Sequence, residues 1–283
     1  MEKVTTKRWK IAEKIPSHVD QALHNYPAFF RQVLFNRGIQ TSEQAEAFLN
    51  PIDDFHDPFR LQNLEGVVDR LLAAIDRHEP IAIYGDYDVD GVSATALLVE
   101  TIELLGGTVS AYIPNRFDEG YGLNTEALDT LKERGIRLVL TVDCGIRSLM
   151  EAEHARAIGL ELIISDHHHP LEEIPRAAFV VCPKQKGDDY PEKNLAGVGV
   201  AYKIAQALVQ RCLKELPYEG FGLDLVALGT VADVVPLTGQ NRMLVRAGLK
   251  ELRRGWRAGL RSLAQAARLT PSTLSTADIG FGL

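Results

Sequence analysis

The sequence has few cysteines, no long apolar run and no overall excess of positive charge. Three of its 283 residues are cysteines, Cys144, Cys182 and Cys212, and none forms a C-x-x-C pair. This usage is typical of a reducing cytoplasm and argues against a disulfide framework or a structural zinc site. No segment approaches the roughly 18 consecutive apolar residues of a membrane span, and the N-terminal MEKVTTKRWK leads into no apolar stretch. We therefore expect a cytoplasmic protein without a secretory signal or a role at a membrane.

Charge is distributed unevenly along the chain. The formal net charge of -7 argues against a protein coated in nucleic acid. From Gln240 onward, however, eight Lys and Arg residues stand against two Asp and Glu residues, so this segment carries +6. Its basic residues include Arg246, Lys250, Arg253, Arg254, Arg257 and Arg261. A run of this kind on a helix is usually a solvated face, and contact with nucleic-acid phosphates is the alternative.

The apolar pattern predicts a helical preface followed by alternating strands and helices. The expected strands are 80–86, 108–114, 136–143, 160–166 and 177–183. The expected helices between and around them are 64–78, 92–106, 124–135 and 148–159, followed by 197–216, 223–235 and 243–269. Strands that alternate with helices favour an α/β fold with a mostly parallel, Rossmann-like sheet and helices on both faces.

Three parts are expected along the chain. Residues 1–60 form the helical preface, which includes a capped helix at SEQAEAFLNP, residues 61–240 form the catalytic domain, and residues 241–283 form a basic helix and the start of a linker. The final STADIGFGL stops on an apolar residue without a polar fringe. We therefore interpret the chain as a piece of a larger protein.

Acidic and imidazole side chains follow three of the predicted strands. They are, in chain order, Asp86, Asp88, Asp90, Asp143, Asp166, His167, His168 and His169. Open parallel sheets bind their ligands at the carboxyl ends of the strands. A single Asp after a strand is more often a turn former or a helix cap. Three such coincidences at one edge of a sheet favour a shared site.

The mixture of carboxylates and imidazoles favours divalent ions of the manganese or magnesium type. Two such ions, roughly 3.5–4 Å apart, can activate a water molecule and stabilise the leaving oxygen of a phosphate ester. Asp143, on the middle strand, is the natural bridge between them. Asp233 lies within the apolar GTVADVVPL, where an unpaired charge would be costly. It is either a further ligand or the partner of a nearby base.

Five motifs occur in the order found in the DHH phosphoesterase superfamily. They are YGDYDVDG, VDCG, SDHHHP, LAGVGVAYK and TVADVVPL. Together with IPNRFDEGYGL and the final DIGFGL, they resemble the catalytic core of the RecJ family of single-strand-specific DNA exonucleases. Tyr84 stands four residues before Asp88, where some relatives have a His, and this favours the exonuclease branch over the pyrophosphatase branch.

The resemblance implies a role for each residue of the metal site. Asp88 and Asp90 match ligands of one metal each, and Asp143 matches the bridging ligand. His167 and Asp233 complete the ligand set. His168 would face the scissile phosphate, Asp166 would orient the neighbouring imidazole, and Asp86 would support a ligand from outside the set. The resemblance implies no chemical role for His169.

Substrate contacts are expected from two further motifs. Arg116 and Tyr121 belong to a glycine-rich loop after a strand, where they would contact a nucleotide. Gly197 and Gly199 precede a predicted helix, so their N–H groups would cradle a phosphate. Close packing of that helix on the sheet is the alternative explanation for these two glycines.

The function that the resemblance implies is 5′ to 3′ exonuclease cleavage of single-stranded DNA in DNA repair and recombination. It would use two divalent cations, preferably manganese, or magnesium instead. The implied partners are single-stranded DNA, a single-strand-binding protein and a recombination helicase, and the chain would act as a monomer. A DHH-associated domain that contacts substrate follows this core in the family and is missing here, so we expect metal binding but slow cleavage.

Three alternatives stay open. A DHH phosphodiesterase acting on small nucleotides would use the same ligands. A non-catalytic DHH scaffold in a replication assembly would typically have lost some of them. A haloacid-dehalogenase-type phosphatase also has a D-x-D motif after a strand, but its first Asp attacks phosphate covalently and it has no use for the Asp-His-His run.

Overall fold

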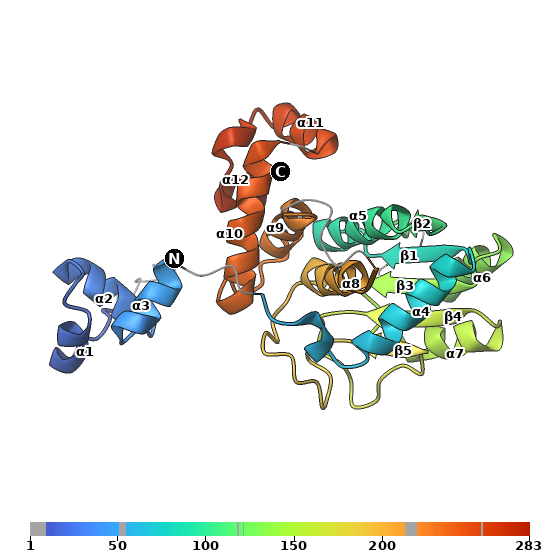
Figure 1. Ribbon diagram of the computed structural model, residues 1–283, viewed down its shortest axis with the longest axis horizontal. Coiled ribbons are helices and arrows are strands. Elements are labelled where there is room, and N and C mark those ends of the chain that lie inside the picture. Colours follow the sequence, from blue (N-terminus) through green and yellow to red (C-terminus); the bar gives the residue numbers. More distant parts are fainter. Residues whose placement is uncertain (1–9, 51–54, 118, 121, 213–219, 256) are drawn as a thin grey trace, which may run out of the picture. The chain divides into compact units, whose positions relative to one another are not determined.

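The computed structural model describes residues 10–50, 55–117, 119–120, 122–212, 220–255 and 257–283 (Figure 1). The chain divides into two compact units, Met1–Asp54 and Phe55–Leu283. Among the described residues no helix is long and apolar enough to cross a membrane. The domain boundaries that the sequence predicts at residues 60 and 240 stay predictions.

The first unit is helical, as the sequence predicts. Its helices are α1 (Ser17–Ala22), α2 (Ala28–Asn36) and α3 (Ser42–Leu49). Helix α3 begins at a capping box, in which the Thr41 side chain accepts a hydrogen bond from the Gln44 N–H and the Gln44 side chain bonds back. A small core of its own forms from Val19, Leu23, Leu34, Ile39 and Ala45.

The second unit contains a five-stranded parallel sheet. Its strands are β1 (Ile81–Gly85), β2 (Val109–Tyr112), β3 (Leu138–Val142), β4 (Glu161–Ser165) and β5 (Phe179–Val181). The strand order is β2-β1-β3-β4-β5, and every neighbouring pair is parallel. The chain moves outward from β1 to β2 and then continues on the other side of β1 with β3. This creates a topological switch point between β1 and β3, where open α/β sheets bind ligands.

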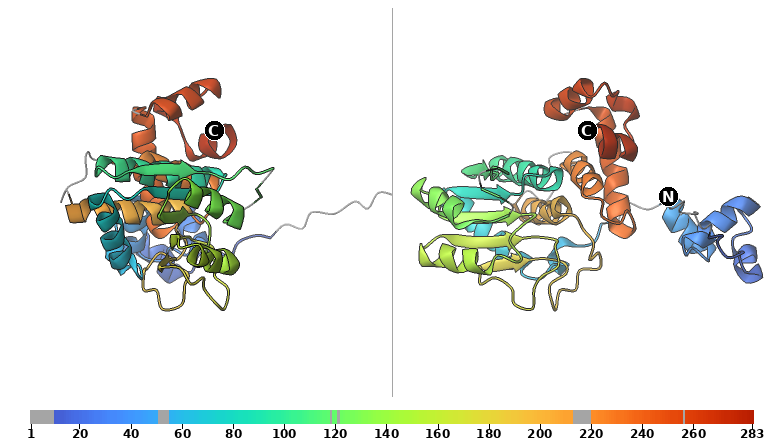
Figure 2. Two further views of the ribbon diagram at one scale, coloured as in Figure 1. Left: turned by 90° about the vertical axis from the view of Figure 1, so that its right-hand side faces the viewer. Right: turned by 180° about the vertical axis from the view of Figure 1, so that it is seen from behind.

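Helices cover both faces of the sheet (Figures 1 and 2). Helices α4 (Leu64–Asp76), α5 (Val89–Leu104) and α8 (Gly197–Cys212) share a core with one face. Helices α6 (Thr125–Glu133) and α7 (Leu149–Ala157) share a core with the other. Side chains of β1 pack alternately into the two cores. Ile81 and Ile83 belong to one core, and Ala82 and Tyr84 belong to the other. Burial on both faces explains the nearly continuous apolar sequence of the central strands and confirms the predicted α/β fold.

The C-terminal part is helical, with a correction to its boundaries. It contains α9 (Leu223–Ala232), α10 (Gly239–Arg254), α11 (Ala258–Ala266), a 3₁₀ turn at Pro271–Thr273 and α12 (Thr276–Gly282). The single helix predicted over 243–269 is therefore wrong. Helix α10 ends because Gly255 adopts a left-handed conformation, with φ of 64°, at its C-cap. A second 3₁₀ turn, Pro58–Arg60, precedes α4 at the other end of this unit.

Candidate metal centre

Three strand ends bring acids to the same level of the sheet. Asp86 follows β1, Asp143 follows β3 and Asp166 follows β4. The strands are paired in register, since Gly85 pairs with Val142 and Thr141 pairs with Ile164. The first residue after each strand therefore reaches the same edge. All three aspartates are buried, so their charges need partners.

The turn from β1 into α5 positions the other two acids of the first motif. Asp88 is the N-cap of α5, and its side chain accepts a hydrogen bond from the Gly91 N–H at 2.9 Å. Asp90 lies in the first turn of that helix, where its carboxylate is buried. Asp86 accepts a hydrogen bond from the N–H of Tyr87 through Oδ1. Its other oxygen, Oδ2, is buried and has no hydrogen-bond partner among the described residues.

Asp90 is held by the beginning of α8. Its two carboxylate oxygens accept hydrogen bonds from the N–H groups of Gly197, at 2.6 Å, and Val198, at 2.8 Å. Burial raises the pKa of Asp90 to about 7, an effect that these two hydrogen bonds oppose. The amide of Gly197 is thus engaged by a carboxylate of the protein. Gly197 and Gly199 also lie within the first turn of α8 instead of before it.

Gly197 has a second reason to lack a side chain. A Cβ built at this position would lie 2.6 Å from both Cβ and Oδ1 of Asp143, closer than real atoms approach. A Cβ at Gly199 would instead meet Leu195 at 3.3 Å. The close packing of α8 that the sequence left as an alternative is therefore present at Gly197, where it brings the helix against Asp143.

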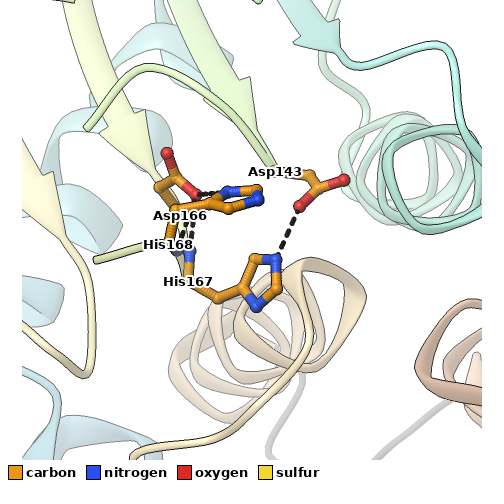
Figure 3. A group of neighbouring side chains, drawn as sticks. All are labelled: Asp143, Asp166, His167 and His168. Carbon is orange, nitrogen blue, oxygen red and sulfur yellow. Dashed lines mark hydrogen bonds and ion pairs between the residues drawn. The ribbon is translucent and has the colours of Figure 1, made fainter. Parts of the chain in front are cut away.

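The side chains of Asp143 and His167 point toward one another (Figure 3). Oδ1 of Asp143 is 3.0 Å from Nε2 of His167, yet neither atom has a hydrogen-bond partner among the described residues. The same nitrogen is 3.7 Å from Oδ2 of Asp233 and 3.9 Å from Oδ2 of Asp90. Three carboxylates therefore surround one imidazole nitrogen.

Burial and crowding set the protonation of this group. Burial raises the pKa of Asp143 to about 11, and the nearby carboxylates of Asp90 and Asp88 add to the rise. Burial lowers the pKa of His167 to about 4, so the imidazole is neutral and can act as a ligand. Burial and the charge of Asp88 raise the pKa of Asp233 to about 6. A cation bound among these groups would stabilise the ionised carboxylates. Its binding would therefore lower their pKa values and release protons.

His168 is oriented by Asp166. Oδ1 of Asp166 accepts hydrogen bonds from Nδ1 of His168, at 2.8 Å, and from the N–H groups of His167 and His168. Its Oδ2 accepts one from the Ile146 N–H at 2.9 Å. The bond to Asp166 raises the pKa of His168 despite partial burial. For Asp166, burial favours a higher pKa, but its hydrogen bonds outweigh burial and lower it. The side chain of His169 is exposed, and its carbonyl oxygen accepts a hydrogen bond from Nε of Arg147.

Ligand atoms of eight residues fall into three overlapping groups. These groups are Asp86, Asp88 and Asp143; Asp90, His167 and Asp233; and Asp143, Asp166, His167 and His168. The structure thus brings together all five residues that the sequence predicts as ligands. It also places Asp86, for which the resemblance implies only a supporting role, beside Asp88 and Asp143. The register of the strands is the signal that reveals this, because Asp86 and Asp143 occupy equivalent positions on neighbouring strands.

The predicted substrate residues are more scattered. Arg116 is exposed on the loop after β2, and its guanidinium carbon lies 5.2 Å from the centre of the Tyr87 ring. The loop residue therefore reaches the segment that carries Asp86 and Asp88. Tyr121 lies outside the described residues.

The basic residues of the C-terminal part are placed in two ways. Arg254 pairs with Glu251 at 2.8 Å, and Arg257 pairs with Asp224 at 2.8 Å and with Glu100 at 2.9 Å. Nε of Arg253 donates a hydrogen bond to the carbonyl oxygen of Leu274 at 2.8 Å. These three side chains therefore have partners within the protein. A cavity of about 370 Å³ beside α10 is lined by Arg242, Arg246, Lys250 and Arg253, together with Leu237, Val245, Leu249 and Thr276.

Comparison with known proteins agrees with this geometry. Residues 80–230 match the model of the DHH family, N-terminal domain. The single-stranded-DNA-specific exonuclease RecJ of Bacillus subtilis (strain 168) is 46% identical over 281 residues, covering 98% of this chain and 35% of the relative. RecJ of Escherichia coli (strain K12) is 36% identical over 269 residues, covering 91% of this chain and 46% of the relative.

A crystal structure of RecJ from Thermus thermophilus in complex with Mn²⁺ matches with a TM-score of 0.77 and 32% identity, covering 94% of this chain and 37% of that one. The chain thus spans between a third and a half of the length of these relatives. The order of its motifs, its parallel sheet and the match over residues 80–230 lead to one conclusion: the chain belongs to the DHH family.

Proposed function

We propose that this chain is the catalytic core of a metal-dependent nuclease that hydrolyses phosphodiester bonds in single-stranded DNA, as a 5′ to 3′ exonuclease. One observation carries the proposal. Two groups of donor atoms lie at the carboxyl ends of the strands, one formed by Asp86, Asp88 and Asp143 and the other by Asp90, His167 and Asp233. They meet where Oδ1 of Asp143 lies 3.0 Å from Nε2 of His167. The single-stranded-DNA-specific exonucleases among its relatives support the choice of substrate.

The donor atoms fit two divalent cations. Oδ2 of Asp86, Oδ1 of Asp143 and Nε2 of His167 are buried without hydrogen-bond partners among the described residues, which is costly unless a cation binds them. Carboxylate oxygens and imidazole nitrogens suit manganese and magnesium. Asp86, Asp88 and Asp143 would hold one ion, and Asp90, Asp143, His167 and Asp233 would hold the other. Structures of the Thermus thermophilus relative with Mn²⁺ and with Mg²⁺ support a site for either ion, and manganese as the preferred one is part of the proposal.

Each residue near the site then has a defined task. Divalent cations bound there would activate the attacking water and stabilise the charge that develops on the phosphate. His168, held through Nδ1 by Asp166, presents the other side of its ring to the substrate and donates a hydrogen bond to a phosphate oxygen. Its raised pKa favours the protonated ring that this contact needs. The N–H groups of Gly197 and Val198 fix the orientation of Asp90.

A polynucleotide substrate is favoured over a small nucleotide by the basic cavity beside α10. Four cationic side chains line it along one helix face. Residues four apart on a helix are about 6 Å apart along its axis, a spacing comparable to that of successive phosphates in an extended strand. Such a row supports backbone contact without sequence preference.

The remaining parts of the proposal follow from the same function. Residues 1–60 are the helical preface, residues 61–240 the catalytic domain, and residues 241–283 the basic segment and the start of a linker. The protein would act as a cytoplasmic monomer in DNA repair and recombination. A single-strand-binding protein and a recombination helicase would be its partners.

Cleavage assays on end-labelled DNA test the proposed function. Single- and double-stranded oligonucleotides carrying a 5′ or a 3′ label are incubated with this chain and manganese. We expect slow release of mononucleotides from the 5′ end of single strands. Asp143→Asn should reduce the rate by about 100-fold or more, because a neutral amide with one carbonyl oxygen would replace the carboxylate that both ions would share.

Two results would favour the alternatives. Preferential hydrolysis of a linear dinucleotide over oligonucleotides would support a small-nucleotide phosphodiesterase. Absence of manganese binding by calorimetry would support a non-catalytic scaffold.

A further inference from the structure

Two tyrosines on neighbouring strands stack on one another. Tyr84 of β1 pairs in register with Tyr112 of β2, and their ring centroids are 5.2 Å apart with 22° between the ring planes. Tyr84 is fully buried and Tyr112 is partly buried. A stacked aromatic pair is stabilising, so each ring holds its hydroxyl group in a fixed position. Neither tyrosine has a task in the chemistry described above.

The hydroxyl group of Tyr84 holds the end of the loop that joins β2 to α6. It donates a hydrogen bond to the carbonyl oxygen of Gly122 at 2.9 Å and accepts one from Nδ2 of Asn124 at 3.1 Å. Asn124 is also the N-cap of α6, since its Oδ1 accepts a hydrogen bond from the Ala127 N–H at 2.7 Å. The buried hydroxyl therefore joins both the end of the loop and the first turn of α6 to the central strand β1.

The hydroxyl group of Tyr112 holds the first part of the same loop. It donates a hydrogen bond to Oε2 of Glu119 at 2.6 Å. Burial and this hydrogen bond raise the pKa of Tyr112 to about 12, and the same bond lowers the pKa of Glu119. At neutral pH the donor is therefore a hydroxyl group and the acceptor is a carboxylate.

Glu119 also closes the turn that contains Arg116. Its Oε1 accepts a hydrogen bond from the Asn115 N–H at 3.0 Å, and its own N–H donates to the Asn115 carbonyl oxygen at 2.8 Å. Oδ1 of Asn115 in turn accepts a hydrogen bond from the Phe117 N–H at 2.9 Å. The turn is thus ordered by its own hydrogen bonds and tied to β2 through Tyr112.

The loop presents a cation to the turn that carries the first acids of the metal centre. Arg116 is exposed, and its guanidinium carbon lies 5.2 Å from the centre of the Tyr87 ring. Tyr87 stands between Asp86 and Asp88 in the chain. A loop that is ordered before its ligand arrives loses less conformational freedom on binding and therefore binds more tightly.

We propose that Tyr84 and Tyr112 are positioning residues for the substrate: the stacked pair fixes the β2–α6 loop at both ends, so that Arg116 is in place before the DNA strand binds. This inference rests on the proposed function, since it takes single-stranded DNA as the substrate and Arg116 as one of its contacts. Both tyrosines pack in the core that contains α6 and α7, whereas Asp90 and Asp143 contact α8 on the other face of the sheet. Loss of the hydroxyl groups should therefore weaken DNA binding and leave metal binding unchanged.

Variants that replace tyrosine by phenylalanine test this inference, because they keep the stacked rings and remove only the hydroxyl groups. Tyr84→Phe and Tyr112→Phe are compared with the wild type and with Tyr202→Phe. Tyr202 is the matched control, because it is also buried but belongs to the core on the other face of the sheet.

Three quantities are measured for each protein. Single-turnover cleavage of a labelled single-stranded oligonucleotide with manganese, over a range of protein concentrations, gives a half-saturating concentration and a maximal rate. Calorimetry gives the affinity for manganese. Hydrogen exchange at the amides of Phe117 and Glu119 reports the order of the loop without any DNA present.

We expect the half-saturating concentration to rise about five- to tenfold in Tyr84→Phe and in Tyr112→Phe, the loss expected for one hydrogen bond. The maximal rate and the manganese affinity should stay unchanged, because the loop contributes to binding and not to the chemical step. Both amides should exchange faster in these two variants, and Tyr202→Phe should match the wild type. Arg116→Ala should also raise the half-saturating concentration. Adding Tyr84→Phe to it should cause little further loss, because the tyrosine acts through the arginine.

The inference would be overturned if Tyr84→Phe and Tyr112→Phe had the same half-saturating concentration as Tyr202→Phe. It would also be overturned if the effects of Tyr84→Phe and Arg116→Ala multiplied in the double variant. A wild-type chain that binds no manganese and cleaves no DNA would instead contradict the proposed function. In that case faster exchange in the two variants would still support the tyrosine pair as the anchor of the loop, and unchanged exchange would refute it.

Discussion

At the scale of single residues, the segment Asp166–His169 places four neighbouring side chains in different environments. The ring of His167 reaches Asp143 in the interior, and that of His168 lies against Asp166 with more than a third of its side chain exposed. His169 points to solvent. The three histidines have the same side chain, so their residue type alone does not show which of them contacts Asp143, which contacts Asp166 and which faces solvent.

Alanine substitutions along this run should give three different results. His167→Ala should lower manganese affinity by about tenfold or more, because a ligand is lost. His168→Ala should keep the affinity for manganese and lower the cleavage rate, since its proposed contact is with the substrate. His169→Ala should change neither, because its side chain is exposed and the atom that bonds to Arg147 is its backbone carbonyl oxygen. Calorimetry and single-turnover cleavage measure the two quantities, and equal losses of manganese affinity in all three variants would contradict the assignment.

At the scale of elements, α8 supports the site through its first turn and carries a buried lysine further along. The first turn supplies two N–H groups to Asp90 and contacts Asp143 through a glycine. The first turn of α8 can make these contacts with Asp90 and Asp143 only if the helix lies close to the sheet. Both contacts join residues that lie far apart in the chain, so the position of α8 determines whether the donor groups converge.

Two glycine variants test whether the close contact between α8 and Asp143 matters for the metal centre. Gly197→Ala would place a methyl group 2.6 Å from Asp143, and overpacking of this kind costs about 1–3 kcal/mol. We expect lower stability and a loss of manganese affinity, measured by urea unfolding and calorimetry. Gly199→Ala is the control, because the atoms nearest to its Cβ belong to the Leu195 side chain and lie 3.3 Å away or more, and alanine is favoured within a helix. If Gly197→Ala bound manganese as well as Gly199→Ala does, the close contact would be unimportant.

Lys203 provides a prediction about pH. The side chain is buried, and Nζ donates to the carbonyl oxygen of His56 and to Oε1 of Gln206, both at 2.9 Å. Burial lowers its pKa to about 7, so between pH 7 and about 10 the unfolded chain binds more protons at this residue than the folded one does. The free energy of unfolding should therefore rise with pH across this window through this group.

The variant Lys203→Met isolates that contribution. It keeps a long side chain in the core but cannot titrate. Urea unfolding of both proteins is measured at pH 7 and pH 9.5. Between these two pH values the free energy of unfolding of the wild type should rise by roughly 2–4 kcal/mol more than that of the variant. An identical pH dependence in the two proteins would mean that Lys203 is charged in the folded state.

At the scale of the whole molecule, the candidate ligands are contributed by β1, α5, β3, β4 and α9, all within Phe55–Leu283. The metal site should therefore form in this chain without the further length that its relatives have. Most of the affinity of a protein for nucleic acid comes from phosphate contacts. We accordingly expect metal binding to be intact and DNA binding to be weak.

Thermal unfolding with and without manganese, together with DNA binding, tests whether this chain binds metal but binds DNA weakly. At a manganese concentration about 100 times the Kd, mass action should add about 3 kcal/mol to the stability of the unit that binds it. For a unit of this size that corresponds to a rise in Tm of roughly 5–10 °C. Asp143→Asn should show little rise, and labelled oligonucleotides should bind weakly with little dependence on length. A wild-type Tm unchanged by manganese would contradict the metal centre, and tight, length-dependent DNA binding would show that the chain holds most of the substrate path.

Local patterns in the sequence were sufficient for the fold class and for most of the site. The apolar runs of the strands and the acids that end them depend on neighbouring residues, so they can be recognised one segment at a time. The parallel order that places β1, β3 and β4 side by side was also predictable in outline, because alternating strands and helices allow few arrangements. The resemblance of the motifs supplied the roles of Asp88, Asp90, Asp143, His167 and Asp233.

Other features depended on the tertiary structure because they arise from contacts between distant segments. Asp86 joins Asp88 and Asp143 only through the register of β1 with β3. The N–H groups that hold Asp90 come from residues more than 100 positions later, and Gly197 is needed only because α8 approaches Asp143. The placement of the basic residues, some in ion pairs at Asp224 and others along a cavity, likewise follows from the turn at Gly255 and the packing of α9 and α10. A local pattern identifies which residues carry chemistry, but distances and shared partners exist only once the chain has folded.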